Sequence, residues 1–574
     1  MKIRHLSIKY FRGIKELNWN VIGSTICLVG PGDSTKSTIL DAIELALSSR
    51  WNLTFNDSDF FGCNTQNPIE IIVTVGEFPD RLHDDQKFGL HLRGWNKDKG
   101  LIDEPIDGFE EVISIKLIID SSLEPSWFIV TDRNKDGVRI SSKDREALGV
   151  ARLGGYVDRH LSWSRGSALS KLTDDVENIP SILADASRKA KESVSQAQLD
   201  ILKAASLRAQ QSAIQFGVKP HKGFIPALDI GSIAIGASFL SLHDGDIPVR
   251  LAGQGSKRLL AIALEKYGLK SGAILLIDEI EQALEGFRVR NLLRLLKIQE
   301  TEKGQVILTT HSNVVVTEMA LLDMFVVRNI DGITTVTEIP TMLKNSVSKT
   351  PDALLARKVV VCEGLTELGF CQALNHYWSN TMGIPMEYQG VVPVVPIQGG
   401  GDDAPKVAFA ISELGYITSF FGDSDKEIRP NEADLSKRGV KVIRWADKKC
   451  IEQRICVDLP WETVGLFIEL CISVVSENIE KEIATRSVLD AIYARLNLAS
   501  GSLKSIDPNK WVDLSIDQQA IRKAIGDSAG QKGWFKKIDV GFKLGEFVVS
   551  TLEQISPETD LFQKISLLKE WVYD

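Results

Sequence analysis

The sequence predicts an α/β fold, in which apolar strands alternate with helices. A short apolar run at residues 26–29 ends in a glycine-rich loop, and a helical pattern of apolar residues follows from Ser37. A second apolar run at 273–277 is followed by a leucine-rich helical stretch and by a third run at 306–308. Strands and helices alternate again from Lys358. This alternation is typical of parallel sheets covered by helices.

The composition is that of an ordinary globular protein. At roughly 100 to 200 residues per domain, the 574 residues suffice for two or three domains. Hydrophobic residues make up 44% and charged residues 25%, which excludes disordered, collagen-like and disulfide-scaffold chains. Because 67 Lys and Arg face 76 Asp and Glu, the formal net charge is -9, and any phosphate-binding surface must be a local patch.

The cysteines and the N-terminus favour a cytoplasmic protein. The 7 cysteines are scattered without a C-x-x-C pair, and we interpret them as buried thiols of a reducing compartment. Residues 1–17 interleave Lys and Arg with apolar residues, unlike a signal peptide. No stretch reaches about 18 uncharged apolar residues, so we expect no membrane partner.

The first part of the chain contains further strands and one long helical segment. Alternation of charged and apolar residues up to Ile14 predicts two strands, and β-rich runs follow at 69–75 and 111–119. Between about residues 179 and 216, apolar residues recur at three- and four-residue intervals among Ala, Ser, Lys and Gln. This predicts a long amphipathic helix or helical hairpin. It either lies on its own domain or serves as a dimerisation arm, and the composition does not decide between them.

The second half of the chain predicts a smaller sheet followed by helices. Residues 340–357 form a polar connector bracketed by Pro340 and Pro351. The elements expected after it are strands at 358–362, 391–397 and 417–421 and a helix at 366–374. This order predicts a second parallel sheet. The remainder, from about Pro460, is helix-rich.

A glycine-rich loop lies between the strand at 26–29 and the helix that follows. It reads Gly30-Pro31-Gly32-Asp33-Ser34-Thr35-Lys36-Ser37-Thr38. Backbone N–H groups of such a loop bind phosphate oxygens, Lys36 can span the terminal phosphates, and the Ser37 hydroxyl can hold Mg²⁺. The pattern G-x-x-x-x-G-K-[ST] has glycine where this chain has Thr35. Taken alone, the loop is a nucleotide site or a plain turn.

Two further strand ends carry residues suited to the same chemistry. Asp278 and Glu279 directly follow the apolar strand, where one suits Mg²⁺ and the other an attacking water. The strand at 306–308 delivers His311 to the same sheet edge, where it can sense a γ-phosphate. Acids that cap a buried strand, or a lone histidine, are each more often structural. Three such elements in this order favour a nucleotide site.

Together these motifs resemble an ABC-type ATPase head of the kind shared by SMC, RecF and OLD proteins, over roughly residues 1–340. The resemblance rests on Ile8-Lys9-Tyr10-Phe11-Arg12-Gly13-Ile14, the P-loop, Leu251-Ala252-Gly253-Gln254-Gly255-Ser256, Asp278-Glu279 and His311. It implies ATP as cofactor, and it implies that the loop Gly253 to Ser256 is the signature motif, which contacts ATP bound to a partner head. Ala252 replaces the usual serine of that motif. The resemblance therefore implies at least a homodimer.

Four acids are expected at the carboxyl edge of the second sheet. Glu363 and Glu367 follow its first strand, and Asp423 and Asp425 follow a later one, on the same face of an extended segment. Converging carboxylates suit Mg²⁺ or Mn²⁺, and two ions can bracket a scissile phosphate. The alternative for either motif alone is a solvated strand end.

With a glycine-rich turn at 399–401 between them, these acids resemble the Toprim domain of topoisomerases, primases and OLD nucleases. The family's Glu-Gly and Asp-x-Asp motifs map onto Glu363, Gly364, Asp423 and Asp425. The resemblance also implies further metal ligands and a lysine that stabilises the transition state. Glu367 fits the ligand role, and Glu452 matches less closely. For the lysine we favour Lys532, with Lys536 and Lys537 as competitors and a solvated basic run as the alternative.

An ABC head followed by a Toprim domain resembles the OLD (overcoming lysogenization defect) family of ATP-dependent endonucleases. We expect an ATPase head at 1–175 and 219–345, a helical insertion at 176–218, and a Toprim domain with a helical C-terminal elaboration at 355–574. The resemblance implies an ATP-regulated, metal-dependent DNA endonuclease of bacterial anti-phage defence, like those of Gabija or retron systems. Its partners would be DNA, itself, and a helicase or a retron reverse transcriptase with its nucleic acid.

Two other functions remain open from the residues. A RecF- or SMC-like ATP-dependent DNA clamp would have the same head, with structural carboxylates and no nuclease activity. A Toprim enzyme that religates or primes is less favoured, because none of the 8 tyrosines stands in an evident nucleophile motif. The sequence leaves open the cut-site preference, the oligomer number and whether ATP activates or restrains cleavage.

Overall fold

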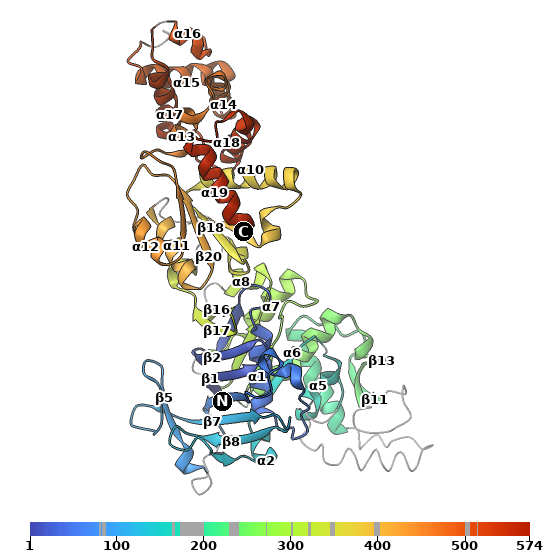
Figure 1. Cartoon of the computed structure of the whole chain (residues 1–574). Helices are drawn as coiled ribbons and strands as arrows, with labels where there is room; N and C mark the ends of the chain where they lie inside the picture. The colour runs from blue at the N-terminus through green and yellow to red at the C-terminus, as the bar shows by residue number, and fades with distance from the viewer. Residues whose placement is uncertain are drawn as a thin grey trace. The chain divides into compact units, whose positions relative to one another are not determined.

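The computed structural model describes most of the chain (Figure 1). The described residues are 1–79, 82, 88–155, 157–163, 167–172, 200–228, 240–270, 272–299, 302–319, 323–344, 350–394, 402–499, 505–513 and 515–574. They form two compact units, Met1–Ile339 and Pro340–Asp574. Each unit has a hydrophobic core of its own.

The first unit is organised around one large mixed sheet. Its path among the described residues is β10 (Val150–Leu153), β14 (Ile274–Ile277), β15 (Gln305–Thr309), β3 (Thr25–Val29), β16 (Asp323–Ile330), β17 (Ile333–Glu338), β2 (Ile14–Asn20), β1 (Lys2–Phe11), β4 (Ile69–Gly76), β7 (Glu110–Ile119), β5 (Arg93–Asn96) and β6 (Gly100–Ile102). Two further strands, β8 (Ser126–Val130) and β9 (Val138–Arg139), extend from β7.

The first five strands of this path, β10 to β16, are parallel. Strands β3, β14 and β15 are buried along their whole length, which explains why the sequence shows them as continuous apolar runs. The helices of this unit are α1 (Lys36–Leu47), α2 (Ser142–Glu146), α3 (Ala168–Lys171), α5 (Asp200–Gln215), α6 (Gln254–Lys270), α7 (Gly286–Leu296) and α8 (Asn313–Met319). Because parallel strands end at one sheet edge, the loops after β3, β14 and β15 meet there.

The segment between the two halves of this unit is described in part. Of the helix expected over 179–216, the structure describes α5, and residues 173–199 lie outside the described residues. A small antiparallel sheet follows, formed by β11 (Phe224–Leu228), β12 (Leu240–Asp244) and β13 (Ile247–Pro248). Helix α5 contacts both β11 and α6, so the described part of the segment packs on its own unit.

The second unit contains a parallel sheet of four described strands. Their order is β19 (Val391–Val394), β18 (Lys358–Cys362), β20 (Ile417–Gly422) and β21 (Lys441–Arg444). The predicted second parallel sheet is therefore confirmed. The glycine-rich turn expected at 399–401 lies outside the described residues.

Helices make up the rest of this unit, as the sequence predicts. They are α10 (Leu365–Met382), α11 (Ala404–Glu413), α12 (Glu432–Lys437), α13 (Ile451–Asp458), α14 (Val464–Ser476), α15 (Lys481–Arg495), α16 (Pro508–Val512), α17 (Gln518–Lys532), α18 (Ile538–Thr551) and α19 (Asp560–Tyr573). Glycines let α10 and α18 approach closely: a Cβ added at Gly369 would lie 2.2 Å from the carbonyl oxygen of Ile538. Helix α18 thereby fixes the position of α10, which begins at the sheet's carboxyl edge.

The structure shows how far the cysteines are buried and whether any helix could cross a membrane. Five of the 7 free cysteines are buried, but Cys63 is exposed and Cys450 is half-buried, so the interpretation of all as buried thiols is wrong for these two. Cys63 is the last residue of a 3₁₀ turn, Phe61–Cys63, at the surface of the first unit. Among the described residues, no helix is long and apolar enough to cross a membrane.

Candidate functional site

The glycine-rich loop has the geometry of a phosphate cradle. It connects β3 to α1, and its backbone is left-handed at Gly30, Asp33 and Thr35. Glycine is required at position 30, where φ is 146° and an added Cβ would lie 2.5 Å from the carbonyl oxygen of Val327. Gly32 is exposed with nothing within 4 Å of an added Cβ, which leaves the mouth of the loop open.

Lys36 fills this loop with its own ammonium group. Its Nζ donates to the carbonyl oxygens of Gly30 (3.0 Å) and Pro31 (2.8 Å) and to Ser34 Oγ (3.0 Å). Burial lowers the pKa of Lys36 to about 8, against the opposing effect of nearby acids such as Asp278. The ammonium therefore lies where the oxygens of a phosphate would replace the carbonyls as its partners.

Thr35 takes the left-handed conformation that glycine usually supplies in this pattern. Its φ is 68°, which is unusual for a β-branched residue. Its hydroxyl donates to the carbonyl oxygen of Ser34 at 2.6 Å and lies 3.3 Å from Thr334 Oγ1. The neighbouring Gly13 leaves space for it, since an added Cβ there would lie 3.2 Å from Thr35 Cγ2. Threonine is thus accommodated at position 35, where the loop pattern has glycine, at a cost in backbone strain.

We expect Thr35→Gly to stabilise the protein slightly and to speed ATP turnover. The left-handed backbone costs threonine about 1–2 kcal/mol, and glycine gives back about 0.5–1 kcal/mol through unfolded-chain entropy. The free energy of unfolding should therefore rise by up to about 1 kcal/mol, as measured by urea denaturation. Wild-type turnover should stay below roughly 10 s⁻¹, the typical enzyme median. A less stable and slower variant would contradict the strain argument.

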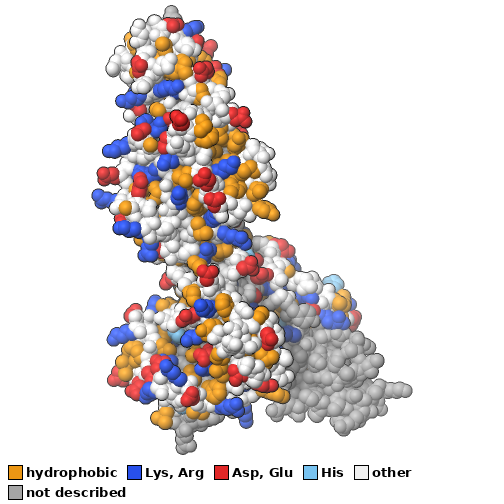
Figure 2. All heavy atoms as spheres, in the orientation of Figure 1, with side chains coloured by type: hydrophobic (Ala, Val, Ile, Leu, Met, Phe, Trp, Pro, Cys, Tyr) orange, Lys and Arg blue, Asp and Glu red, His pale blue; other side chains and the backbone are white. Residues whose placement is uncertain are grey.

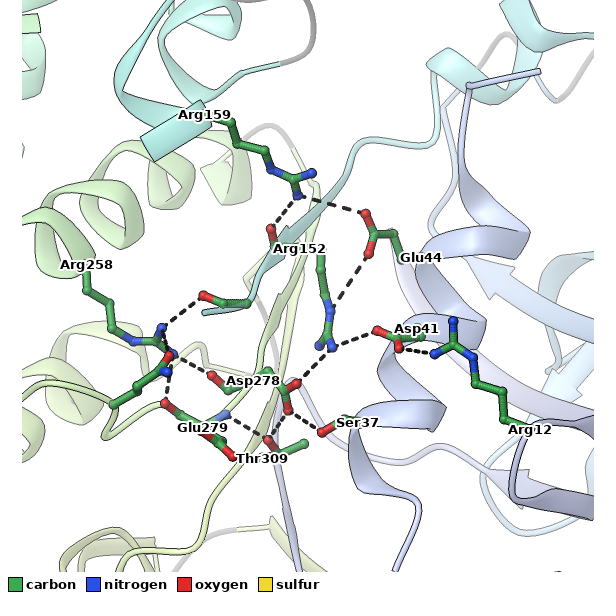
Figure 3. Close-up of polar contacts among 12 residues, drawn as sticks. Arg12, Ser37, Asp41, Glu44, Arg152, Arg159, Arg258, Asp278, Glu279 and Thr309 are labelled. Carbon is green, nitrogen blue, oxygen red and sulfur yellow. Dashed lines mark hydrogen bonds and ion pairs between the residues drawn. The ribbon is translucent and has the colours of Figure 1, made fainter. Parts of the chain in front are cut away.

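Asp278 stands at the carboxyl end of β14 and faces the loop (Figure 3). Its Oδ1 accepts from Ser37 Oγ at 2.9 Å and from Thr309 Oγ1 at 2.6 Å. Thr309 Oγ1 in turn accepts from the backbone N–H of Glu279 at 2.9 Å, and Glu279 has a φ of 45°. The strand ends of β14 and β15 thus bring a carboxylate beside the Ser37 hydroxyl, the pairing that a Mg²⁺ ion with nucleotide requires.

His311 lies at the same sheet edge as the loop. Its backbone N–H donates to Glu281 Oε1 at 2.7 Å, and the other oxygen of Glu281 accepts from the Thr310 hydroxyl at 2.8 Å. Burial lowers the pKa of His311, and the nearby charge of Lys36 lowers it further. Both effects favour the neutral imidazole at this edge of the sheet.

The predicted signature loop is exposed at the start of α6. Gly253 and Gln254 are exposed, and Ser256 is half-buried. An added Cβ at Gly255 would lie 2.5 Å from the carbonyl oxygen of Ala283, so glycine is needed where the loop crosses the segment after Asp278-Glu279. The exposed backbone of Gly253 leaves this loop accessible to a second copy of the chain.

Sequence reasoning missed a group of charged residues around Asp278. Arg152 on β10 donates to Asp278 Oδ2 (3.0 Å) and Asp41 Oδ1 (2.8 Å), and Arg12 donates to Asp41 Oδ2 (2.6 Å), as Figure 3 shows. Arg258 on α6 donates to the carbonyl oxygens of Asp278 and Glu279. Asp41, an acid in the helix after the P-loop, can be seen in the sequence. Its partners Arg12 and Arg152 are distant from it in sequence, so no local pattern links them.

A second constellation lies at the carboxyl edge of the four-stranded sheet. Glu363 follows β18 and Asp423 follows its neighbour β20. One carboxylate oxygen each from Glu363, Asp423 and Asp425 lies within 4.8 Å of the others. Glu363 Oε2 accepts from the Asp423 N–H at 2.7 Å, and Asp423 Oδ1 accepts from the Ile451 N–H at 2.8 Å. The structure therefore brings all three predicted acids together.

Glycines make this close approach possible. An added Cβ at Gly422, the last residue of β20, would lie 2.5 Å from Glu363 Oε2. At Gly364, before α10, it would lie 3.1 Å from Glu367 Oε2. The Glu-Gly motif thus leaves room for the carboxylate of Glu367 at the helix N-terminus.

Glu367 and Glu452 form the buried side of the same cluster. Burial raises the pKa of Glu367 to about 8, and the charges of Glu363 and Glu452 act in the same direction. Burial likewise raises the pKa of Asp423 to about 10, with contributions from Glu367, Glu363 and Glu452. The pKa values of Glu363 and Glu452 are also raised by burial. Such mutual repulsion of buried acids favours either protons or a bound cation.

The three candidate lysines lie on the two sides of a turn. Lys532 is in the last turn of α17, Lys536 and Lys537 follow the turn, and all three are exposed. Gly533 then turns the chain with a φ of 63°, and the carbonyl oxygen of Phe535 accepts from the Thr366 hydroxyl at 2.9 Å. This contact ties the following residue, Lys536, to the start of α10. Burial raises the pKa of Glu452, and the charge of Lys536 is among the contributions that oppose this rise.

The carboxylate cluster fits a hard divalent ion. Its donors are all carboxylate oxygens, the ligand type that Mg²⁺ and Mn²⁺ prefer. Oxygens on opposite sides of a six-coordinate Mg²⁺ lie roughly 4.2 Å apart, which is compatible with the 4.8 Å limit of Glu363, Asp423 and Asp425. Burial raises the pKa of Glu363 even though the charges of Arg444 and Lys426 act in the opposite direction.

Comparison with known proteins supports the ATPase nature of the first unit. Residues 95–317, less than half of the chain, match the family model "AAA domain, putative AbiEii toxin, Type IV TA system". No curated protein matches the chain significantly.

Solved structures of ATPase heads are similar to part of the chain. An SMC head bound to the C-terminal winged-helix domain of ScpA has 18% identity and a TM-score of 0.37, with 59% of this chain and 97% of that chain covered. The SMC head of Thermotoga maritima has 16% identity, a TM-score of 0.30, and coverages of 59% and 100%. RecF from the RecFOR pathway has 14% identity, a TM-score of 0.36, and coverages of 59% and 98%. The chain contains an ATPase-type α/β domain.

Proposed function

We propose that the protein is an ATP-regulated, divalent-metal-dependent DNA endonuclease of the OLD type. The observation that carries this proposal is the meeting of Glu363, Asp423 and Asp425 at one sheet edge, with the buried acids Glu367 and Glu452 acting electrostatically on Asp423. A stability role does not account for it, because buried acids that repel one another cost free energy. A cation that holds a phosphodiester would offset that repulsion.

In this proposal the acids divide into two groups by burial. Glu363, Asp423 and Asp425 hold one Mg²⁺ or Mn²⁺ ion, and Asp425 is exposed toward the substrate side. Glu367 and Glu452, which are both buried and both act on Asp423, contribute to a second ion. Two bound ions supply Lewis-acid chemistry to the attacking and leaving oxygens of the phosphate.

For the basic role we propose Lys536 in place of Lys532. Lys536 acts electrostatically on Glu452 and follows a residue that is bonded to the start of α10. An ammonium beside the cluster can stabilise the negative charge that develops on a phosphate during cleavage. Lys536→Ala, with Lys532→Ala as the matched comparison, assigns this role: the larger loss of cleavage identifies the active lysine.

The head would make cleavage depend on nucleotide. The proposed ATP site is formed by the P-loop with Lys36 and Ser37, by the acids Asp278 and Glu279, and by His311. Thr38 contributes from the first turn of α1, and Gly253 and Ser256 are contributed by a second copy of the chain. Figure 2 shows basic and acidic side chains interspersed on the visible face.

A plasmid assay tests the proposal directly. Purified protein with Mg²⁺ or Mn²⁺ should nick or break plasmid DNA, and EDTA should stop the reaction. Addition of ATP, or of a non-hydrolysable analogue, then shows whether nucleotide activates or restrains cleavage. Intact plasmid under all conditions, together with ATP-dependent DNA binding, would instead identify a RecF- or SMC-like clamp.

We further propose a cytoplasmic role in anti-phage defence. The family description that matches the head names a toxin of a toxin–antitoxin system, which fits a nuclease held inactive until infection. A helicase or a retron reverse transcriptase with its nucleic acid would be the partner. Protection of a bacterial host against phage by the wild type, but not by an Asp423→Asn variant, tests this role.

We expect the protein to be at least a homodimer. One chain offers one P-loop and one signature loop, and Gly253 and Gln254 are exposed. Two-fold pairing is the commonest way to place each loop against the other's nucleotide. Light scattering with ATP and Mg²⁺ should give about twice the chain mass of 63.4 kDa. Leu251, which is 65% exposed beside the loop, provides a control, since Leu251→Asp should weaken the pairing. A monomer mass with and without nucleotide would contradict the expectation.

A further inference from the structure

The buried arginine Arg152 joins the two sides of the proposed nucleotide site. It lies on β10, whose register with β14 places it opposite Leu276, and the N–H of Asp278 donates to the carbonyl oxygen of Leu153 at 2.9 Å. Its side chain is 8% exposed. From this position a single nitrogen, Nη2, donates both to Asp278 at the end of β14 and to Asp41 on α1 (Figure 3).

The acids around Arg152 are unequally distributed. On the α1 side the guanidinium pairs with Asp41 at 2.8 Å and lies 3.8 Å from Glu44, whereas on the β14 side it pairs with Asp278 alone. Asp41 is held in place by Arg12, which takes its other oxygen. Arg152 would therefore keep two carboxylate partners if it lost Asp278.

Three side-chain donors contact the carboxylate of Asp278. Its Oδ1 accepts from two hydroxyls, Ser37 and Thr309, and its Oδ2 accepts from Arg152. Arg152 thus supplies the positive charge beside an acid that is suited to Mg²⁺. A divalent ion and a guanidinium at one carboxylate repel each other, with twice the interaction of two single charges at the same distance.

We propose that Arg152 is a positioning residue that competes with a divalent cation for Asp278. It releases Asp278 when Mg²⁺–nucleotide binds and stays with Asp41 and Glu44 on α1. The exchange sets the Mg²⁺ concentration that nucleotide binding requires, and it shifts the arginine from the β14 side to the helix after the P-loop. This inference rests on the proposed nucleotide site.

The test measures binding of a fluorescent ATP analogue as a function of Mg²⁺, without any assay of turnover. In Arg152→Gln, the Mg²⁺ concentration for half-maximal binding should fall by about tenfold, because the competing charge is gone. In EDTA the same variant should bind the analogue several-fold more weakly than the wild type, because the charge of Asp278 is then uncompensated. A merely structural role would weaken binding under both conditions.

Two further variants make the outcome decisive. Arg159→Gln removes the same charge from the same segment, but Arg159 contacts Glu44 and the Arg152 backbone and not Asp278, so its Mg²⁺ dependence should match the wild type.

Arg152→Lys keeps the charge and should restore most of the wild-type Mg²⁺ requirement, even if the glutamine variant fails to fold. An unchanged or higher Mg²⁺ requirement in Arg152→Gln, or a lysine variant that behaves like it, would overturn the inference. Wild-type protein that binds no nucleotide at any Mg²⁺ concentration would overturn the nucleotide site itself.

Discussion

Asp423→Asn is expected to reduce metal-dependent DNA cleavage by at least about 10²-fold, because loss of one ligand weakens both the binding and the orientation of the ion. The asparagine keeps the size of the side chain and can still accept from the Ile451 N–H, which the structure places 2.8 Å from Asp423 Oδ1. The measured quantity is the initial rate of plasmid nicking at saturating Mg²⁺ or Mn²⁺. ATP binding should be unchanged, since the proposed ATP site is formed by other residues.

A matched control and a stability measurement separate this effect from misfolding. Asp434→Asn removes the same charge from an exposed position on α12, beside the same sheet, and should leave cleavage within about twofold of the wild type. Near-wild-type cleavage by Asp423→Asn would contradict the metal assignment.

The raised pKa values make the stability of the metal-free protein depend on pH, and they determine the direction of that dependence. The pKa of Asp423 rises on folding from 3.8 to about 10, and that of Glu367 from 4.5 to about 8. Their neutral forms therefore stabilise the metal-free fold at low pH, and this contribution is lost as pH rises from about 4 towards 8 and above. In EDTA, Asp423→Asn should lose less stability than the wild type between pH 6 and pH 9. Added Mn²⁺ should restore the wild type at the higher pH.

The sequence predicts well those parts of the sites that local pattern determines. The strands before the P-loop and before Asp278 are buried apolar runs, and the strand before Asp423 is buried from its second residue on. Parallel pairing sets the acids that follow such strands at common sheet edges. The proximity of Glu363 to Asp423 follows from the pairing of β18 with β20. The periodicity of apolar residues and the positions of strand ends are thus sufficient to predict those site residues that the backbone itself positions.

Residues that act through long side chains could not be predicted in this way. Arg152 reaches Asp41 across 111 positions of sequence, and no periodicity relates the two. The placement of the C-terminal lysines depends on the left-handed turn at Gly533, which separates Lys532 at the end of α17 from Lys536 in the segment tied to Thr366. Such positions are determined by packing between distant segments, which a single sequence does not encode in any local pattern.

Lys36→Ala is expected to weaken ATP binding by about 10- to 100-fold, which corresponds to the roughly 1.5–3 kcal/mol of one hydrogen bond to a charged group. In the structure Lys36 is buried and held by the loop itself, so its ammonium is already at the position where phosphate oxygens would bind. Binding of a fluorescent ATP analogue at fixed Mg²⁺ measures the loss. Lys303→Ala, at an exposed position of the same unit, should bind like the wild type.

The pKa of Lys36 makes the same experiment sensitive to pH. Because burial lowers that pKa to about 8, the lysine is mostly protonated at pH 7 and loses its charge as pH rises above about 8. A bound triphosphate favours the charged form, so binding above pH 8 must take up a proton and should weaken with rising pH. Lys36→Ala lacks this group, and its weaker binding should stay nearly constant between pH 7 and pH 9.5. A wild-type affinity that does not change over this range, or a Lys36→Ala variant that binds as tightly as the wild type, would show that Lys36 does not contact the nucleotide.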